Sequence, residues 1–168
     1  MDLTYMNGPE LLKKENKLDE NFKICILGVG FVGLTLAIAL AKRNISVIGL
    51  DINVELIQSL NNGETDVIEP NIKEFLQETL HSGKLSFRHS SEDLSILKSC
   101  NTYILTVGTP LRGNEISLES ITNALNQIID YISDGDLVIL RSTTSVGTAN
   151  EVVRPILNKK SKSISLAM

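Results

Sequence analysis

The 168-residue sequence contains no tryptophan, and aromatic residues make up only 4% of it. Proteins that bind single-stranded nucleic acid stack the bases on aromatic side chains, and this chain offers few of them. Acidic residues outnumber basic ones, so the formal net charge is −4 at pH 7. The composition therefore predicts no nucleic-acid partner and no attraction to an anionic membrane surface.

Cysteine and histidine are also scarce, with two of each in the chain. Cys25 and Cys100 are too few for a disulfide framework, which favours a reducing, cytoplasmic location. Both lie in or beside apolar runs, so we interpret them as structural residues rather than nucleophiles. We predict no metal site, and we expect His81 and His89 to be solvated on the side of the molecule away from any ligand.

No long apolar run precedes residue 22, so we expect no secretory signal. Residues 1–21 are polar and charged, and we interpret them as an extension, with a partner-contact arm as the alternative. The segment Ile24 to Ala41 is apolar and long enough to cross a bilayer. Its three glycines within six residues argue for a turn instead, so we predict no membrane partner.

Residues 23–51 carry the most informative motif. An apolar, β-branched run leads into the glycine turn GVGFVG at Gly28–Gly33, and a helix-period stretch follows. A second apolar run ends on Asp51, which stands 18 residues after Gly33. Strand, glycine turn, helix, strand and terminal acid together form the dinucleotide-binding fingerprint.

Each part of this fingerprint has a physical role. Gly28 allows a sharp turn off the strand, Gly30 lets the backbone approach a pyrophosphate, and Gly33 lets the helix lie close to the sheet. The helix N-terminus offers unpaired N–H groups and partial positive charge to the phosphates. Asp51 would accept hydrogen bonds from the adenosine ribose and repel a 2′-phosphate, which predicts NAD rather than NADP as the cofactor.

Strand-like and helix-like segments alternate along the rest of the chain. We therefore predict that residues 22–168 form an α/β dinucleotide-binding domain with a doubly wound, parallel, six-stranded Rossmann sheet of order 3-2-1-4-5-6. The predicted strands are 23–27, 46–50, 85–88, 102–107, 137–140 and 163–168. Helices are predicted after Gly33, at 53–61, 71–81, about 92–98 and 117–132, and from a capping box at Thr148–Glu151 that Pro155 should kink or shorten.

In such a sheet the ligand lies beyond the carboxyl ends of the strands, at the switch between the first and fourth. Two loops there carry hydroxyl groups. Thr109 follows the fourth strand and either contacts the cofactor or caps its own turn. The loop Arg141–Thr148 places several hydroxyls at the expected nicotinamide end, where they orient a water or an alkoxide, or serve as ordinary turn caps.

The combined motifs resemble the UDP-glucose/UDP-N-acetylmannosamine dehydrogenases, which are nucleotide-sugar 6-dehydrogenases. The resemblance covers about residues 22–168 and looks closest to the UDP-N-acetylmannosamine branch. It differs at Ser142–Ser145, where the family often has Ser-Thr-Val-Pro, and at Asn101, where an aspartate is usual. The residues that carry it are Gly28–Leu34, Asp51–Asn53, Gly63, Glu69-Pro70, Val107–Pro110 and Arg141–Thr148.

The resemblance implies a four-electron oxidation of a UDP-sugar at C6, with two NAD molecules and a cysteine thiohemiacetal and thioester. It implies a cytoplasmic homodimer or larger homo-oligomer in polysaccharide biosynthesis, with Thr143 supporting a water or oxyanion near the reaction centre. The family's catalytic cysteine and lysine lie in later domains, so we expect this chain to bind NAD without turnover. The predicted cofactor contacts are Gly28, Gly30, Phe31, Val32, Gly33, Asp51, Val107, Gly108, Thr109 and Thr143.

Two alternatives stay open. One is another NAD-dependent dehydrogenase, of the 6-phosphogluconate or 3-hydroxyacyl-CoA type, which shares the first strand–helix–strand unit. The other is a non-catalytic dinucleotide-binding module, because the residues assigned here all concern binding.

Overall fold

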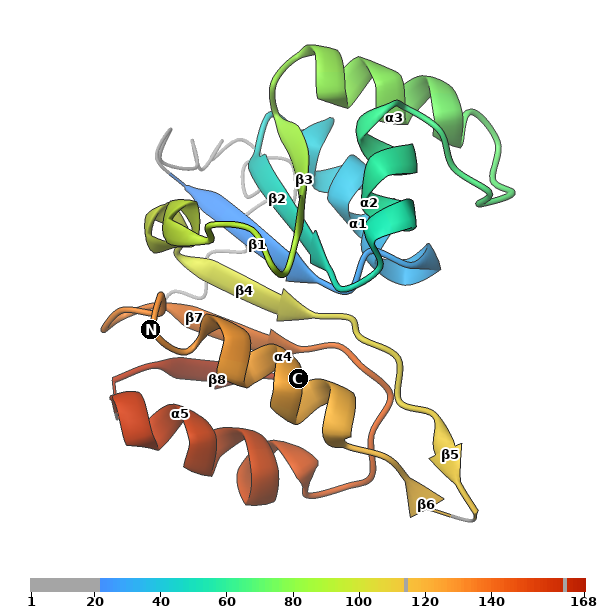
Figure 1. The fold of residues 1–168 in the computed structure, drawn as a ribbon. Coiled ribbons are helices and arrows are strands. Elements are labelled where there is room, and N and C mark those ends of the chain that lie inside the picture. Colours follow the sequence, from blue (N-terminus) through green and yellow to red (C-terminus); the bar gives the residue numbers. More distant parts are fainter. Residues whose placement is uncertain (1–21, 114, 162) are drawn as a thin grey trace, which may run out of the picture.

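A computed structural model describes residues 22–113, 115–161 and 163–168 of the chain. The extension predicted at residues 1–21 lies outside the described residues. A six-stranded parallel sheet of order β3-β2-β1-β4-β7-β8 forms the centre of the molecule, with helices on both faces (Figure 1). The strands are β1 (Lys23–Leu27), β2 (Ser46–Asp51), β3 (Leu85–His89), β4 (Thr102–Leu105), β7 (Leu137–Leu140) and β8 (Ser165–Ala167).

This topology confirms the predicted fold and strand order. The two strands missing from the count, β5 (Leu111–Arg112) and β6 (Glu115–Ile116), form a separate antiparallel hairpin. That hairpin projects from the connection between β4 and the next helix (Figure 1). The sequence pattern does not predict this hairpin, because two-residue strands are too short to show a period.

Alternating residues of the central strands point to opposite faces, and both faces are covered. Ile24 and Ile26 of β1 face one buried cluster, whereas Cys25 and Leu27 face the other. The first cluster is covered by α1 (Phe31–Ala41), α2 (Val54–Asn61) and α3 (Ile72–His81). The second is covered by the 3₁₀ helix η1 (Ser95–Ser99), α4 (Glu119–Ile128), the π-helical turn η2 (Ala149–Val153) and α5 (Arg154–Lys160).

The apolar character of α1 comes from its position against the sheet. The helix has eleven residues, and among the described residues no helix is long and apolar enough to cross a membrane. A Cβ on Gly33 would collide with the carbonyl oxygen of Gly28 and lie 2.8 Å from Oγ1 of Thr106. Only glycine therefore allows α1 to approach β1 and β4 this closely.

Several helix boundaries differ from the predictions. The segment around 92–98 forms only the 3₁₀ helix η1, and α4 spans Glu119–Ile128 instead of the predicted 117–132. The predicted capping box is wrong, because the Thr148 hydroxyl donates to the carbonyl oxygen of Ser145 at 2.8 Å and the chain enters a π-helical turn. Pro155 lies in the first turn of α5, directly after this π-helical turn.

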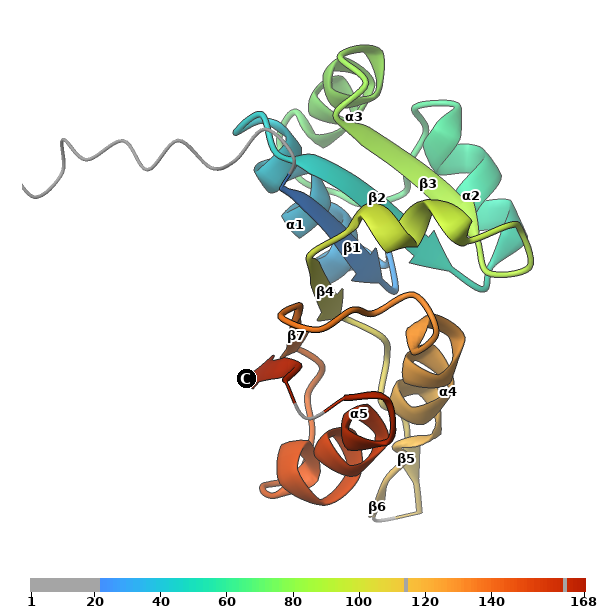
Figure 2. The same cartoon turned by 90° about the vertical axis from the view of Figure 1, so that its left-hand side faces the viewer.

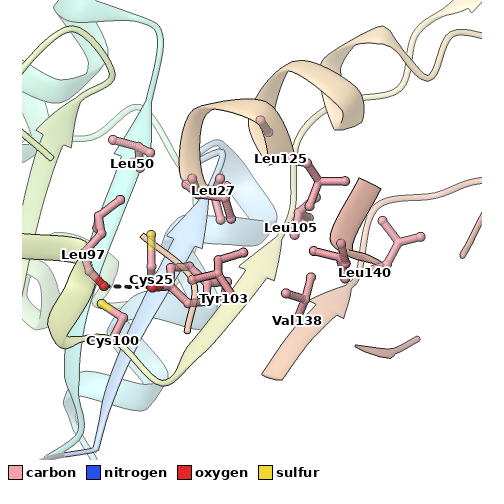
Figure 3. Close-up of a cluster of buried hydrophobic side chains, with 14 of the residues drawn as sticks. Cys25, Leu27, Leu50, Leu97, Cys100, Tyr103, Leu105, Leu125, Val138 and Leu140 are labelled. Atoms are coloured by element: carbon pink, nitrogen blue, oxygen red, sulfur yellow. Dashed lines mark hydrogen bonds between the residues drawn. The ribbon is translucent and has the colours of Figure 1, made fainter. Parts of the chain in front are cut away.

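Both cysteines lie inside the cluster that α4 covers (Figure 3). The neighbouring Tyr103 is fully buried, and its hydroxyl donates to the carbonyl oxygens of Leu97 at 2.8 Å and Tyr131 at 3.2 Å. Burial raises the pKa of the Cys25 thiol, and it raises the pKa of Cys100 to about 11. These surroundings agree with the interpretation of both cysteines as structural residues.

Neither thiol should react with a disulfide reagent such as DTNB while the protein is folded. The thiolate is the reactive form, and both burial and the raised pKa suppress it. We expect modification of Cys25 and Cys100 only in denaturant, where two thiols per chain should titrate. Rapid labelling of either thiol at neutral pH in the native protein would contradict this interpretation.

Candidate functional site

A cavity of about 850 Å³ opens at the carboxyl ends of β1, β2 and β4. This volume lies within the range of small-molecule and cofactor sites. Figure 2 shows α2 and α4 on opposite sides of the sheet near these carboxyl ends. The described residues that line it are Leu27, Gly28, Gly30, Phe31, Val32, Leu50, Asp51, Ile52, Asn53, Leu56, Thr106, Val107, Gly108, Pro110, Ser120, Asn123, Ala124, Asn126 and Gln127.

The glycine turn shapes the floor of this cavity. Gly28 has a φ of +87°, and a Cβ there would lie 2.9 Å from the backbone of Val107, so only glycine fits. Gly30 is different, because no described atom beyond its neighbours in the chain lies within 4 Å of the position its Cβ would take. Its backbone is extended, with a φ of −64°, and it is the N-cap of α1. The folded chain itself does not require glycine at position 30, which leaves close approach of a ligand as the reason for it.

Asp51 is held rigidly at the end of β2. One carboxylate oxygen accepts from the backbone N–H of Val29 and the other from that of Asn53, both at 2.9 Å. The Asn53 side chain in turn caps α2 by accepting from the N–H of Leu56 at 3.1 Å. Each carboxylate oxygen keeps a free lone pair toward the cavity, so the group can accept two further hydrogen bonds.

The loops after β4 and β7 are tied together by hydroxyl groups. The Thr109 hydroxyl donates to the carbonyl oxygen of Thr143 at 2.6 Å, and that of Ser142 donates to the carbonyl oxygen of Val107 at 2.7 Å. Thr109, Thr143 and Gly33 lie outside the residues that line the cavity. The structure therefore places Thr109 beside Thr143, and both lie outside the cavity lining.

The sequence analysis did not predict a role for Thr106. Its hydroxyl donates to the carbonyl oxygens of Leu27 at 3.0 Å and Gly28 at 2.7 Å, which fastens the glycine turn to the end of β4. A threonine directly after a buried strand is a signal that could have identified it. The departure at Asn101 proves structural, because its side-chain oxygen accepts from the N–H of Lys23 at 2.9 Å, at the opposite end of β1.

The expectation that His89 lies away from the ligand is wrong. His89 ends β3 and pairs with Asp51, so it lies at the same carboxyl edge as the cavity. Its Nε2 lies 2.9 Å from the carbonyl oxygen of Ile52, and the N–H of Ser91 donates to its Nδ1 at 3.2 Å. Nδ1 is thus the acceptor and Nε2 the donor, so the ring holds the loop that follows Asp51. His81 ends α3, which leads by a turn into the amino end of β3.

The sequence did not predict that one face of α4 borders the cavity. Four polar residues on it line the cavity, and a sequence pattern alone does not say which side of a helix meets the sheet. The four residues are Ser120, Asn123, Asn126 and Gln127.

Among the described residues, no group of three or more histidine, cysteine or acidic side chains is placed to bind a metal ion.

Comparison with known proteins agrees with this geometry. Residues 22–168 match the family model for the UDP-glucose/GDP-mannose dehydrogenase family, NAD binding domain. A UDP-N-acetyl-D-mannosamine dehydrogenase of Pyrococcus horikoshii is 37% identical over 136 residues, which cover 81% of this chain and 32% of that protein. A GDP-mannose 6-dehydrogenase of Pseudomonas syringae pv. tomato is 33% identical over 139 residues, which cover 80% of this chain and 31% of that protein.

Solved structures show the same relationship. The UDP-N-acetyl-mannosamine dehydrogenase of Staphylococcus aureus superposes with a TM-score of 0.78 and 28% identity, over 86% of this chain and 35% of that one. The chain thus spans about a third of the length of the relatives it matches.

Proposed function

Because this chain belongs to the UDP-glucose/GDP-mannose dehydrogenase family and matches its NAD-binding domain, we propose that it forms the cofactor site of a nucleotide-sugar 6-dehydrogenase. The substrate we propose is a UDP-N-acetylhexosamine such as UDP-N-acetylmannosamine, oxidised at C6 to the uronate. The observation that carries the assignment of the site is the open space at Gly30 beside the rigidly held Asp51.

The N-terminal turn of α1 is the proposed pyrophosphate site. The backbone of Gly28, Gly30, Phe31 and Val32 borders the cavity there, and the first N–H groups of a helix have no partner within the helix. They donate to phosphate oxygens, and the helix dipole adds to the attraction. Gly33 acts indirectly, because it lets α1 sit close enough to the sheet to present these groups.

The adenosine ribose is assigned to Asp51, whose free lone pairs accept from the 2′- and 3′-hydroxyls. A 2′-phosphate at the same place would meet a fixed negative charge, so the site favours NAD over NADP. The nicotinamide half then runs toward Val107 and Gly108 at the end of β4. NAD supplies the hydride acceptor for oxidation of the alcohol, and these residues bind and orient it.

Thr109 and Thr143 occupy the far end of this path. The Thr109 proton is already donated to the Thr143 carbonyl, so Thr109 meets NAD as an acceptor or by positioning the loop. The side chain of Thr143 is exposed, and we propose that it orients a water or supports an oxyanion when sugar is bound. Its role is supporting, since a hydroxyl beside no base is not a strong nucleophile.

The choice of sugar rests on relatives rather than on cavity residues. Several of the relatives are named UDP-N-acetyl-D-mannosamine dehydrogenases, and others are named GDP-mannose 6-dehydrogenases. An assay of the natural gene product with both nucleotide sugars and with UDP-glucose separates these possibilities. We expect UDP-N-acetylmannosamine to yield two NADH per sugar, and a clear preference for either other sugar would overturn the assignment. A cytoplasmic homo-oligomer in polysaccharide biosynthesis completes the proposal.

The 168-residue chain by itself is expected to bind NAD without oxidising the sugar. Both of its thiols are buried, so neither can attack a sugar aldehyde. Saturating NAD should raise the unfolding midpoint, since a ligand at about 100 times its Kd stabilises by roughly 2.7 kcal/mol. NADH absorbance should stay flat when UDP-N-acetylmannosamine is added. Steady NADH formation would contradict the inactivity, and an unchanged midpoint at millimolar NAD would favour a different ligand.

A further inference from the structure

Helix α4 presents two adjacent stripes of different chemistry. One stripe is apolar and buried against the sheet. The second stripe lies at the spacing i, i+3 and i+7 and lines the cavity with polar side chains. The buried stripe is Ile121, Ala124, Leu125 and Ile128, and the polar stripe is Ser120, Asn123 and Gln127.

Two of the three side chains in the polar stripe are exposed to solvent. Asn123 and Gln127 are this exposed pair, and the cavity that they border is also lined by apolar side chains such as that of Leu27. Each primary amide carries a carbonyl acceptor and an NH₂ donor side by side. Two such groups, one helical turn apart, form a surface that can match a flat heterocycle with adjacent donor and acceptor atoms.

Apolar side chains complete the other side of this part of the cavity. Ile52, which directly follows Asp51, has 74% of its surface exposed, and Leu56 is half-buried on the first turn of α2. Both line the same cavity as the amide stripe of α4. A base attached to a ribose on Asp51 would reach this region, with an apolar surface for its ring and amides for its polar edge.

We propose that Asn123 and Gln127 hydrogen-bond the adenine of the cofactor, while Ile52 and Leu56 pack against its ring. Adenine carries an amino donor beside a ring-nitrogen acceptor, and a side-chain amide matches that pair with two hydrogen bonds. This inference rests on the proposed NAD site, and it adds a specificity for the base that binding of ribose and pyrophosphate does not provide.

The test compares NAD with 1,N⁶-etheno-NAD, in which a fused ring removes the amino donor of adenine and leaves ribose, pyrophosphate and nicotinamide unchanged. Calorimetric titration of the wild-type chain should show tighter binding of NAD, by about 10-fold or more, the scale of a lost bidentate contact. The double variant Asn123→Ala/Gln127→Ala should bind NAD more weakly and bind the two dinucleotides about equally.

Alanine has a higher helix propensity than asparagine or glutamine, so the double variant should fold at least as stably as the wild type. Gln58→Ala is the matched control, because Gln58 is an exposed amide on α2 outside the cavity lining. It should keep the wild-type preference for NAD. An unchanged preference in the double variant would overturn the adenine assignment, whereas failure of the wild type to bind either dinucleotide would overturn the NAD site itself.

Discussion

Gly30→Val is expected to weaken NAD binding by at least about 100-fold, because its side chain would fill the space through which the pyrophosphate approaches the backbone. The fold should survive. No described atom beyond the neighbouring residues in the chain lies within 4 Å of the Cβ position, and the φ of −64° suits a residue with a side chain. We expect the unfolding midpoint to stay within roughly 4 °C of the wild type, since the N-cap change costs well under 2 kcal/mol.

Valine at Gly33, three residues later, should instead destabilise the fold. Gly33→Val would push a side chain into the carbonyl oxygen of Gly28, which belongs to the backbone and cannot move aside cheaply. Overpacking of this kind costs about 1–3 kcal/mol or more. Thermal unfolding and an NAD titration on both variants check the pair. Equal loss of stability in the two variants, or normal NAD binding by Gly30→Val, would contradict the account of the turn.

Asp51→Asn is expected to weaken NAD binding by about 10-fold or more, since a hydrogen bond to a charged acceptor contributes roughly 1.5–3 kcal/mol. It should also narrow the preference for NAD over NADP, because the fixed charge that repels a 2′-phosphate is gone. Asparagine keeps one side-chain acceptor for the N–H of Val29 or Asn53, so the loop should stay in place. The measurement is the ratio of the NAD and NADP dissociation constants.

Glu55→Gln is the matched control for Asp51→Asn. Glu55 is an exposed acid in the first turn of α2, close in sequence to Asp51 but outside the cavity lining. Removal of this charge should leave the ratio of NAD to NADP affinity unchanged. A similar shift of the ratio in both variants would mean that general charge, and not the placed carboxylate, discriminates between the cofactors.

The sheet could be predicted because its determinants are local and repeated. Apolar runs such as Ile24–Leu27 alternate with helix-period stretches, and parallel strands joined by helices follow few topologies. The cavity could be located for the same reason, since the carboxyl ends of β1, β2 and β4 must meet at one edge. That rule also applies to the end of β3, and its application to His89 would have corrected the one misplaced histidine.

The remaining features depend on tertiary contacts that a single sequence does not reveal. The packing of α4 decides which of its sides meets the cavity. From the sequence alone, Asn123 and Gln127 are therefore indistinguishable from ordinary solvated amides. Thr148 had the spacing of a capping residue, but its hydroxyl bonds the Ser145 carbonyl and a π-helical turn forms instead. Hydroxyl contacts such as that from Thr109 to the Thr143 carbonyl join loops 34 residues apart, beyond any local pattern.

A crystal structure of the chain grown with saturating NAD tests the central claim most directly. The account predicts the pyrophosphate against the N–H groups at the start of α1, within reach of Gly30. It places the adenosine ribose on Asp51 and the nicotinamide toward Val107 and Gly108. NAD bound outside this cavity, or a cavity that stays empty at saturating NAD, would contradict it.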